Sequence, residues 1–461
     1  MSQPRASGQS RPSEPPRPPT EVTAGPREVL SLAVPAFLAL VAEPLFLLVD
    51  SAVVGRLGVT PLAGLGAASA VLTSVAGLFV FLAYGTTAAV ARRMGAGQER
   101  DAAEDGWSGI WLALLIGLAA AAVTGGAARP LVEAVGGSPE VVEQASTYLR
   151  ISALGLPAML LVLAATGVLR GHLDTRTPLV VATVGFTGNA VLNVVLVHGV
   201  GLGIAGAAWG TVIAQVGMAV ALVAVVARHG RRVGASVALR PSRVLASAAD
   251  GVPLLVRTLA LRAVLLLTVA TAASFGDVPL AAHQVTSTVW STLVFALDAI
   301  AIAAQALTGR ALGAGDAPAV RRATTLMMRW GLWSGVAVGV LVALVHRVLP
   351  AAFTQDPDVR SAIAAALLVV AVSQPLAGVV FVADGVLIGA GDGRWLAVAS
   401  TVTLIAYLPM LLLAREVGQG RTAPEAMVVL WIAFSGFMLV RWGTLWWRLR
   451  GDGWLVTGAS R

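Results

Sequence analysis

The chain has no cysteine and no lysine, and only 12% of its 461 residues are charged. The absence of cysteine excludes disulfides, thiolate metal sites and cysteine nucleophiles. The low charge argues against a soluble protein, because soluble domains carry about 25% charged and about 45–50% apolar residues. Here 57% of the residues are hydrophobic, and the mean hydropathy is +0.82. The composition therefore predicts a protein of the membrane.

Motifs of soluble enzymes are missing or misplaced. The sequence has no His-Glu-x-x-His, Gly-x-Ser-x-Gly or phosphate-loop motif, so ATP hydrolysis by this chain is not supported. Gly201-Leu-Gly203-Ile-Ala-Gly206 matches the dinucleotide fingerprint, but it lies between two apolar segments and no acid follows about 20 residues on. We expect no enzymatic activity, no catalytic residue and no cofactor.

Apolar runs of about 20 residues recur along the chain, and each is long enough to cross a bilayer as a helix. Strands of an outer-membrane barrel need only about 9–11 residues and alternate in polarity, so helices are favoured. The predicted fold is an all-α polytopic membrane protein in the lipid bilayer, preceded by a disordered, Pro- and Arg-rich tail over residues 1–26. The twelve expected spans lie near 29–55, 66–90, 107–128, 146–169, 178–200, 203–227, 248–274, 284–308, 330–349, 361–388, 395–414 and 425–447.

Arginine is unevenly distributed between the two sides that twelve spans create. With the N-terminus inside, the inner segments hold most of the arginines, whereas the outer ones hold only Arg56, Arg129, Arg347, Arg360, Arg415 and Arg421. Cytoplasmic segments of membrane proteins are enriched in arginine, so both termini of this multi-pass protein of the cell membrane are expected in the cytoplasm. The same rule explains the net charge of +8 without a nucleic-acid partner.

An internal repeat runs from Pro35 to Arg176 without a gap. Sliding the chain by 218 residues aligns Pro35 with Pro253 and Gly95-Ala96-Gly97 with Gly313-Ala314-Gly315. Each half holds an even number of spans, so the halves enter the membrane from the same side, as in transporters built from two parallel lobes. We expect an N-lobe of six helices over 27–227, a cytoplasmic linker over 228–247, a C-lobe of six helices over 248–450 and a cytoplasmic tail over 451–461.

The acids inside the spans are not copied by this repeat. Asp50 aligns with Thr268, Asp298 with Val80 and Asp384 with Thr166. The matched positions are mostly glycine, proline and loop arginine, which set turns, kinks and close helix contacts. The repeat thus accounts for the helical scaffold that the lobes share, whereas the candidate functional acids are specific to each lobe.

Asp50 is the strongest candidate for a functional residue. A carboxylate inside a span costs roughly 2.5–3.5 kcal/mol on insertion scales unless it is protonated or paired, and such acids usually mark ion or proton paths. The alternative is a structural carboxyl that is hydrogen-bonded to a neighbouring helix. Glu43 lies two turns earlier on the same face, beside Pro44, and is a candidate supporting residue.

Two pairs of polar residues could complete a site around Asp50. Asn189 and Asn193 lie four residues apart on the fifth span, and Thr211 and Gln215 four apart on the sixth, so each pair shares a helix face. Amides and hydroxyls also serve as contacts between membrane helices. With Asp50 they could form an oxygen-lined site for a proton or for Na⁺, and the single negative charge favours the proton.

The second lobe offers Asp298 and Asp384 as acids that could attract a cationic substrate in the cavity between the lobes. Asp298 is the stronger of the two, because Asp384 precedes a glycine turn by five residues and could be a helix-end group. Arg257 and Arg262 are expected near the inner end of the seventh span, where long side chains reach the interface.

Several segments resemble the MATE (multidrug and toxic compound extrusion) family, and its DinF-like branch most of all. They are Glu43-Pro44-Leu-Phe-Leu-Leu-Val-Asp50, Ala282-His283-Gln284-Val285, Leu297-Asp298 with Gln305, and Asp384-Gly385 with Gly389-Ala-Gly-Asp392. The resemblance implies two six-helix bundles and the export of organic, often cationic compounds against H⁺ or Na⁺. It also implies that Asp50 is the essential acid of the first helix and that Asn189, Asn193 and Thr211 line the same site. Some relatives carry an aspartate at the position of Asn193, and the neutral amide here favours H⁺.

These observations predict a monomeric secondary antiporter that exports cationic, drug-like organic compounds in exchange for H⁺ by alternating access of its lobes, with Asp50 as the coupling carboxylate. Two alternatives remain open. One is coupling to Na⁺ at Asp50, Asn189, Asn193 and Thr211. The other is a flippase of lipid-linked saccharides from the same wider superfamily.

Overall fold

The computed structural model describes residues 25–459, apart from the side chain of Glu43. The tail predicted over residues 1–26 lies almost wholly outside the described residues. Every regular element within them is helical: α1 (Pro26–Gly55), α2 (Val59–Leu78), α3 (Phe81–Gly95), α4 (Glu99–Gly126), α5 (Ala128–Val135), α6 (Pro139–Ala153), α7 (Leu156–Gly171), α8 (Arg176–Val194), the π-helix η1 (Val195–Gly199), α9 (Ile204–Arg232), α10 (Pro241–Ser274), α11 (Asp277–Gly313), α12 (Ala317–Val345), the 3-10 helix η2 (Leu349–Ala352), α13 (Pro357–Gly389), α14 (Gly393–Gly418) and α15 (Ala423–Arg450).

The described chain contains eleven helices that are long and apolar enough to cross a membrane, when α2 with α3 and α8 with η1 each count as one. The bent pair of α6 and α7 completes a set of twelve. The predicted all-α polytopic fold with twelve spans is therefore confirmed.

Local sequence explains where several helices begin. The side chains of Ser138, Asp316 and Asp356 each accept a hydrogen bond from a backbone N–H in the first turn of α6, α12 and α13. A proline stands at the first or second position of the same three helices, where its missing N–H is not needed. Thr422 and Glu425 form a capping box at the start of α15.

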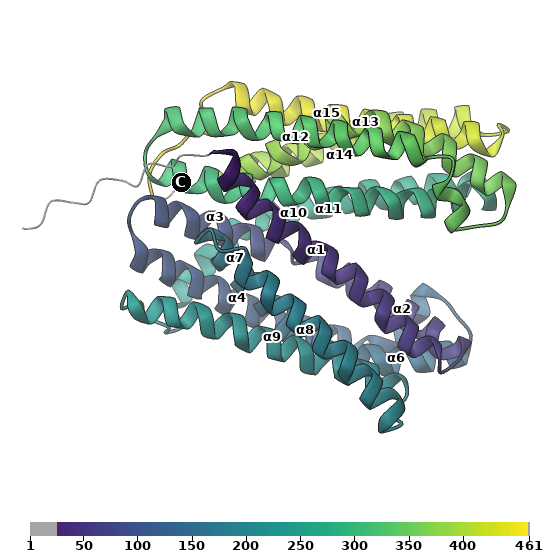
Figure 1. Ribbon diagram of the computed structural model, residues 1–461, viewed down its shortest axis with the longest axis horizontal. Coiled ribbons are helices and arrows are strands. Elements are labelled where there is room, and N and C mark those ends of the chain that lie inside the picture. Colours follow the sequence, from purple (N-terminus) through teal and green to yellow (C-terminus); the bar gives the residue numbers. More distant parts are fainter. Residues whose placement is uncertain (1–24, 460–461) are drawn as a thin grey trace, which may run out of the picture.

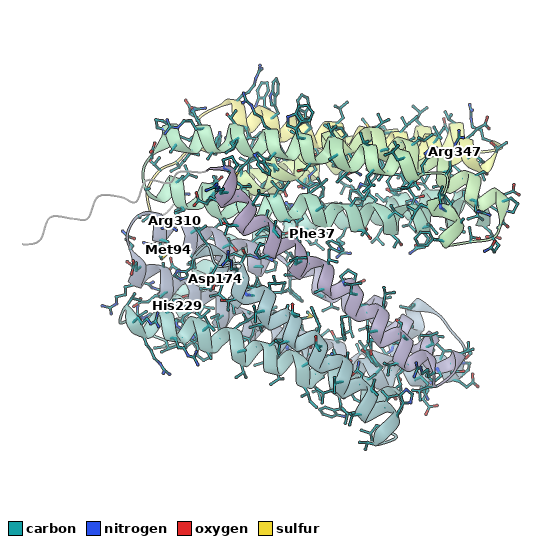
Figure 2. All side chains as sticks on the ribbon, in the orientation of Figure 1. Phe37, Met94, Asp174, His229, Arg310 and Arg347 are labelled. Carbon is teal, nitrogen blue, oxygen red and sulfur yellow. The ribbon has the colours of Figure 1, made fainter. Side chains whose placement is uncertain are left out.

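The helices form two lobes, α1–α9 and α10–α15, that lie together at one end of the molecule and diverge toward the other (Figure 1). Both ends of the described chain lie where the lobes meet, and we call this end the closed end. In Figure 2, Met94 and Arg310 mark the closed end, and Arg347 lies at the opposite end.

A symmetric glycine contact joins the lobes at the closed end. A Cβ atom on Gly95 would overlap the carbonyl oxygen of Arg310, and a Cβ atom on Gly313 would overlap that of Arg92. The two glycines are equivalent in the repeat, and so are the two arginines. The same contact is therefore made twice, across a two-fold axis that passes between α3 and α11.

The C-terminal residues also close this end. The Arg92 side chain of the N-lobe donates a hydrogen bond to the carbonyl of Gly458 at 2.7 Å and another to that of Ala390 at 3.0 Å. The backbone N–H of Gly458 donates to the carbonyl of Leu312 at 3.0 Å. Trp454, within the same segment, is only 1% exposed. Residues 452–459 thus bind both lobes, a contact that the sequence analysis did not predict.

The two lobes differ where their helices break. The N-lobe interrupts one span between α2 and α3 and bends another by 50° between α6 and α7. The equivalent helices of the C-lobe, α11 and α13, are continuous. Pro157 follows the bend in α7, whereas its equivalent Pro375 lies inside α13.

Two further features differ from the sequence prediction. A short helix, α5, lies between α4 and α6, where we expected only a connection. The expected linker over 228–247 is mostly helical, because α9 continues to Arg232 and α10 begins at Pro241. The longer α10 moves Arg257 and Arg262 away from the helix end where the sequence predicted them.

Candidate functional site

Asp50 lies inside the N-lobe, where it links three helices. Its side chain is 1% exposed. Oδ1 accepts a hydrogen bond from the Asn193 amide of α8 at 2.7 Å, and Oδ2 accepts one from the Tyr148 hydroxyl of α6 at 3.3 Å. Two donors thus stabilise a buried carboxylate of α1, as burial of a charge requires. We call Asp50, Asn193 and Tyr148 the N-lobe site.

Other predicted residues lie beside this site. Asn189 is 2% exposed, and its Oδ1 atom, like that of Asn193, has no donor among the described residues. Thr211 lies next to the Tyr148 hydroxyl and donates its own hydrogen bond to the carbonyl of Ala207 at 3.0 Å. The site is therefore rich in oxygen acceptors.

Gln215 and Glu43 have a different status. Gln215 packs against Gly155, which lies at the break between α6 and α7. A Cβ atom on Gly155 would overlap the Oε1 atom of Gln215. It has no hydrogen bond to Asp50 in the structure. Glu43 lies on α1, but its side chain is outside the described residues, so its supporting role stays a prediction.

A neutral pair occupies the equivalent place in the C-lobe. Thr268, the equivalent of Asp50, lies 2.8 Å from the hydroxyl of Tyr407, the equivalent of Asn189. Both side chains are fully buried. The fold therefore tolerates an uncharged pair at this position, which indicates that it does not require a carboxylate there.

A second polar centre is formed mainly by the C-lobe. Asp384 of α13 is paired with Arg257 of α10 and with Arg441 of α15. The Arg257 Nε atom donates to Asp384 Oδ1 at 3.2 Å, and an Arg441 Nη2 atom lies 3.1 Å from Asp384 Oδ2. All three side chains are at most 9% exposed. Asp384 is thus in contact with two arginines, and its suggested role in attracting a cationic substrate stays a prediction.

The N-lobe contributes to the same centre. Asp298 of α11 interacts electrostatically with Arg170 of α7 as well as with Arg257 and Arg441. The ring of Tyr84, on α3, lies 5.9 Å from the Arg257 guanidinium. We call this group, in which both lobes take part, the central cluster: Tyr84, Arg170, Arg257, Asp298, Asp384 and Arg441.

One cavity is lined by the central cluster, and a larger one lies next to it. The smaller one, lined by Tyr84, Asp298 and Asp384, has about 10 Å³, which is room for about one water molecule. The larger one, of about 930 Å³, lies between α3, α4, α10 and α14 and reaches the closed end. Both cavities are lined by Ile388. We call the larger cavity the vestibule.

Sequence reasoning missed Tyr148 and the arginines of the central cluster. Tyr148 is one of only three tyrosines, and its helix carries no other residue that draws attention to it. Arg170 was read as a residue of an inner connection and Arg257 as one near a helix end. Arg257 instead lies near the middle of α10, about 24 Å from the start of that helix. Arginines in mid-membrane need a carboxylate partner, and Asp384 could have suggested one.

No group of three or more His, Cys, Asp or Glu side chains that could hold a metal ion occurs in residues 25–459. A Na⁺ ion at the N-lobe site would have one carboxylate and neutral oxygens as ligands. This composition is acceptable for a hard cation, although it supplies little charge.

Comparison with known proteins agrees with the fold. The sequence model of the MatE family matches residues 35–195 and again residues 253–413, and both ends of the match shift by 218 residues. The chain is 31% identical to protein DETOXIFICATION 44, chloroplastic, of Arabidopsis thaliana, over 92% of this chain and 82% of that protein. It is 28% identical to the DNA damage-inducible protein F of Escherichia coli, over 91% of each.

The solved structure of the Vibrio cholerae MATE transporter VcmN in its bent form has a similar fold. It superposes with a TM-score of 0.83 at 23% identity, over 92% of this chain and 97% of that one. The similarity to DNA damage-inducible protein F supports the DinF-like branch that the motifs suggested. The twice-matched family model, the twelve spans and these relatives establish that the chain belongs to the MATE family of multi-pass membrane transporters.

Proposed function

We propose that this chain is a secondary antiporter that exports organic compounds in exchange for H⁺, with Asp50 as the coupling carboxylate. The observation that carries the proposal is the N-lobe site, where a buried carboxylate is held by donors from two other helices. Its C-lobe equivalent is a neutral pair, which supports a role for the carboxylate beyond folding.

Protonation of Asp50 would change the contacts of α1. The carboxylate accepts charge-assisted hydrogen bonds from Asn193 and Tyr148, and such bonds weaken when the charge is removed. Because α1 also packs against α11 of the C-lobe, a shift of α1 reaches the interface between the lobes. Coupling then requires only that the protonated and deprotonated forms differ in their preference for the two arrangements.

The closed end corresponds to the cytoplasmic side if the arginine distribution sets the orientation. The state described here is then shut toward the cytoplasm by the glycine contact and by residues 452–459. Transport would alternate between this arrangement and one in which α3 and α11 separate. Since one chain supplies both lobes, we propose a monomer as the functional unit.

Replacement of Asp50 by Asn tests the proposal. Asn keeps the size of the side chain but cannot bind and release a proton, so substrate-driven H⁺ movement in proteoliposomes should fall to the rate of empty liposomes. Asp50→Glu retains a titratable group and should keep measurable exchange. Thermal unfolding of both variants in detergent should match the parent chain. Normal H⁺ exchange by a folded Asp50→Asn protein would refute the assignment.

Coupling to Na⁺ is a second candidate, supported by the Asn189 and Asn193 oxygens that lack donors. A Na⁺ gradient imposed at constant pH separates the two possibilities. Transport driven by Na⁺ alone would replace H⁺ with Na⁺ in the proposal.

A flippase of lipid-linked saccharides is the other candidate, and the arginines of the central cluster favour it, because such a protein needs cations for phosphate groups. Movement of a fluorescent lipid-linked sugar phosphate between leaflets, independent of Asp50, would support the flippase. Expulsion of a water-soluble dye would support the antiporter.

A further inference from the structure

The charges of the central cluster do not balance. Arg170, Arg257 and Arg441 face two carboxylates, Asp298 and Asp384. Arginine stays protonated in proteins, so the cluster carries one excess positive charge when both acids are ionised. Protonation of either acid would increase the excess.

An excess positive charge inside a membrane protein is costly unless an anion neutralises it. The repeat copies none of these arginines: the N-lobe equivalents of Arg257 and Arg441 are Ala39 and Val223, and the C-lobe equivalent of Arg170 is Ile388. Helix packing therefore does not require these arginines. The three arginines outnumber the two carboxylates, Asp384 and Asp298. This excess of positive charge indicates a negatively charged ligand.

The vestibule lining holds more arginines than acids. It includes three acids, Asp105, Asp250 and Asp392, and five arginines, Arg92, Arg93, Arg243, Arg394 and Arg448. Arg93, Arg243 and Arg448 are in ion pairs with nearby carboxylates, so the positive charge of the lining is largely compensated. At about 930 Å³, the vestibule is as large as known sites for drug-sized molecules, about 300–1,000 Å³. Ile388 lines both the vestibule and the small cavity of the cluster, so the two cavities lie beside the same side chain.

We propose that the exported compound is an organic acid whose carboxylate is held between the lobes by the arginines of the central cluster after it enters through the vestibule. A guanidinium offers two parallel N–H donors that match a carboxylate. The cavity next to the cluster is too small for such a compound in this state, so the site forms when the closed end opens. This inference rests on the proposed antiport and replaces the cationic substrate that the sequence suggested.

The test compares two dyes of similar size and opposite charge. The purified full-length protein is reconstituted in liposomes with an acidic lumen, and uptake of carboxyfluorescein or ethidium is measured after filtration. We expect uptake of carboxyfluorescein to exceed that of ethidium by at least about tenfold after subtraction of empty liposomes, a difference that one additional ion pair can supply. Uptake of ethidium alone would overturn the inference but leave the antiporter intact.

Binding measured without a gradient keeps the two proposals separate. Carboxyfluorescein should raise the unfolding temperature of the parent chain and of Asp50→Asn, whereas ethidium should not. If neither dye is transported, the antiporter proposal fails, and the binding result alone decides the polarity. Stabilisation by ethidium but not by carboxyfluorescein would refute the anion site.

Arg170→Gln is the most informative variant, because the Arg170 side chain makes no hydrogen bond to another residue within 25–459, so the substitution breaks none. It should weaken carboxyfluorescein binding by about tenfold, and Arg170→Lys should restore part of the affinity by returning the charge. Arg415→Gln, at an exposed position of α14, is the matched control and should bind like the parent chain. Equal binding by Arg170→Gln and the parent chain would exclude Arg170 from the site.

Discussion

At the scale of single residues, Gly210 decides how Asn193 reaches Asp50. A Cβ atom on Gly210 would overlap the Asn193 Oδ1 atom. The Asn193 amide can therefore adopt this position only because residue 210 is a glycine. The carbonyl oxygen of the amide packs against α9 while its nitrogen donates to Asp50. The packing of α8 against α9 therefore sets the geometry of the N-lobe site.

Gly210→Ala should displace Asn193 and reduce H⁺-coupled transport by at least about tenfold, because a lost hydrogen bond to a buried charge costs about 1–3 kcal/mol. Gly217→Ala, on the same helix, is the control, since a Cβ atom there meets no other atom within 4 Å. Proteoliposome uptake by the two variants gives the comparison. Equal activity would show that the contact between Asn193 and Asp50 is dispensable.

His172, at the end of α7, makes stability depend on pH. Burial, followed by the charges of His229 and Arg310, lowers its pKa from 6.5 to about 4. The unfolded chain therefore binds a proton at this residue below about pH 6.5, whereas the folded chain does so only near pH 4. The contribution of His172 to stability is thus full above pH 6.5 and is lost as the pH falls toward 4.

His172→Gln should flatten this part of the pH dependence. The unfolding temperature in detergent, measured at pH 7.5 and pH 5, should fall less for the variant than for the parent chain. An unchanged difference between the two pH values would mean that His172 is protonated in the folded protein.

At the scale of elements, residues 452–459 hold the two lobes together at the closed end. They accept hydrogen bonds from Arg92 of α3 and donate one to Leu312 of α11. Their anchor is Trp454, which is buried and donates to the carbonyl of Leu449 at 3.2 Å. Removal of this segment should therefore favour separation of α3 and α11.

Truncation after Gly451 should lengthen the distance between the lobes at the closed end. The chain has no native cysteine, so Glu99→Cys and Arg322→Cys, both at exposed positions, accept spin labels specifically. Double electron–electron resonance of the labelled pair should show a larger fraction of long distances after truncation. An unchanged distance distribution would mean that the segment does not hold the lobes together.

At the scale of the whole molecule, the paired glycines control how closely the lobes approach. Gly95→Ala or Gly313→Ala places a methyl group on the carbonyl oxygen of the opposite lobe, so either change should open the closed end. The same pair of spin labels should report longer distances for both variants. Gly443→Ala, which meets no other atom within 4 Å, should leave them unchanged.

The sequence predicted the scaffold better than the contacts. Apolar run lengths and the offset of 218 residues predicted twelve spans and parallel lobes, because both depend on the pattern along the chain. The helix breaks after Leu78 and Ala153 were not predicted, because the sequence stays apolar through both of them. Asp50 and Asn193 were identified as neighbours in function, but the pairing of Asp384 with Arg257 and Arg441 was not. Those three residues come from helices far apart in the chain, and only folding brings them together.

The N-lobe site lies within one lobe, whereas the central cluster takes side chains from both lobes, and the repeat copies neither of them. A gene duplication that produced two equal halves would have left each half free to change alone. Under the proposed antiport, substitutions in the central cluster would change the exported compound without touching Asp50, and substitutions in the N-lobe site would change the coupling ion without touching the cluster.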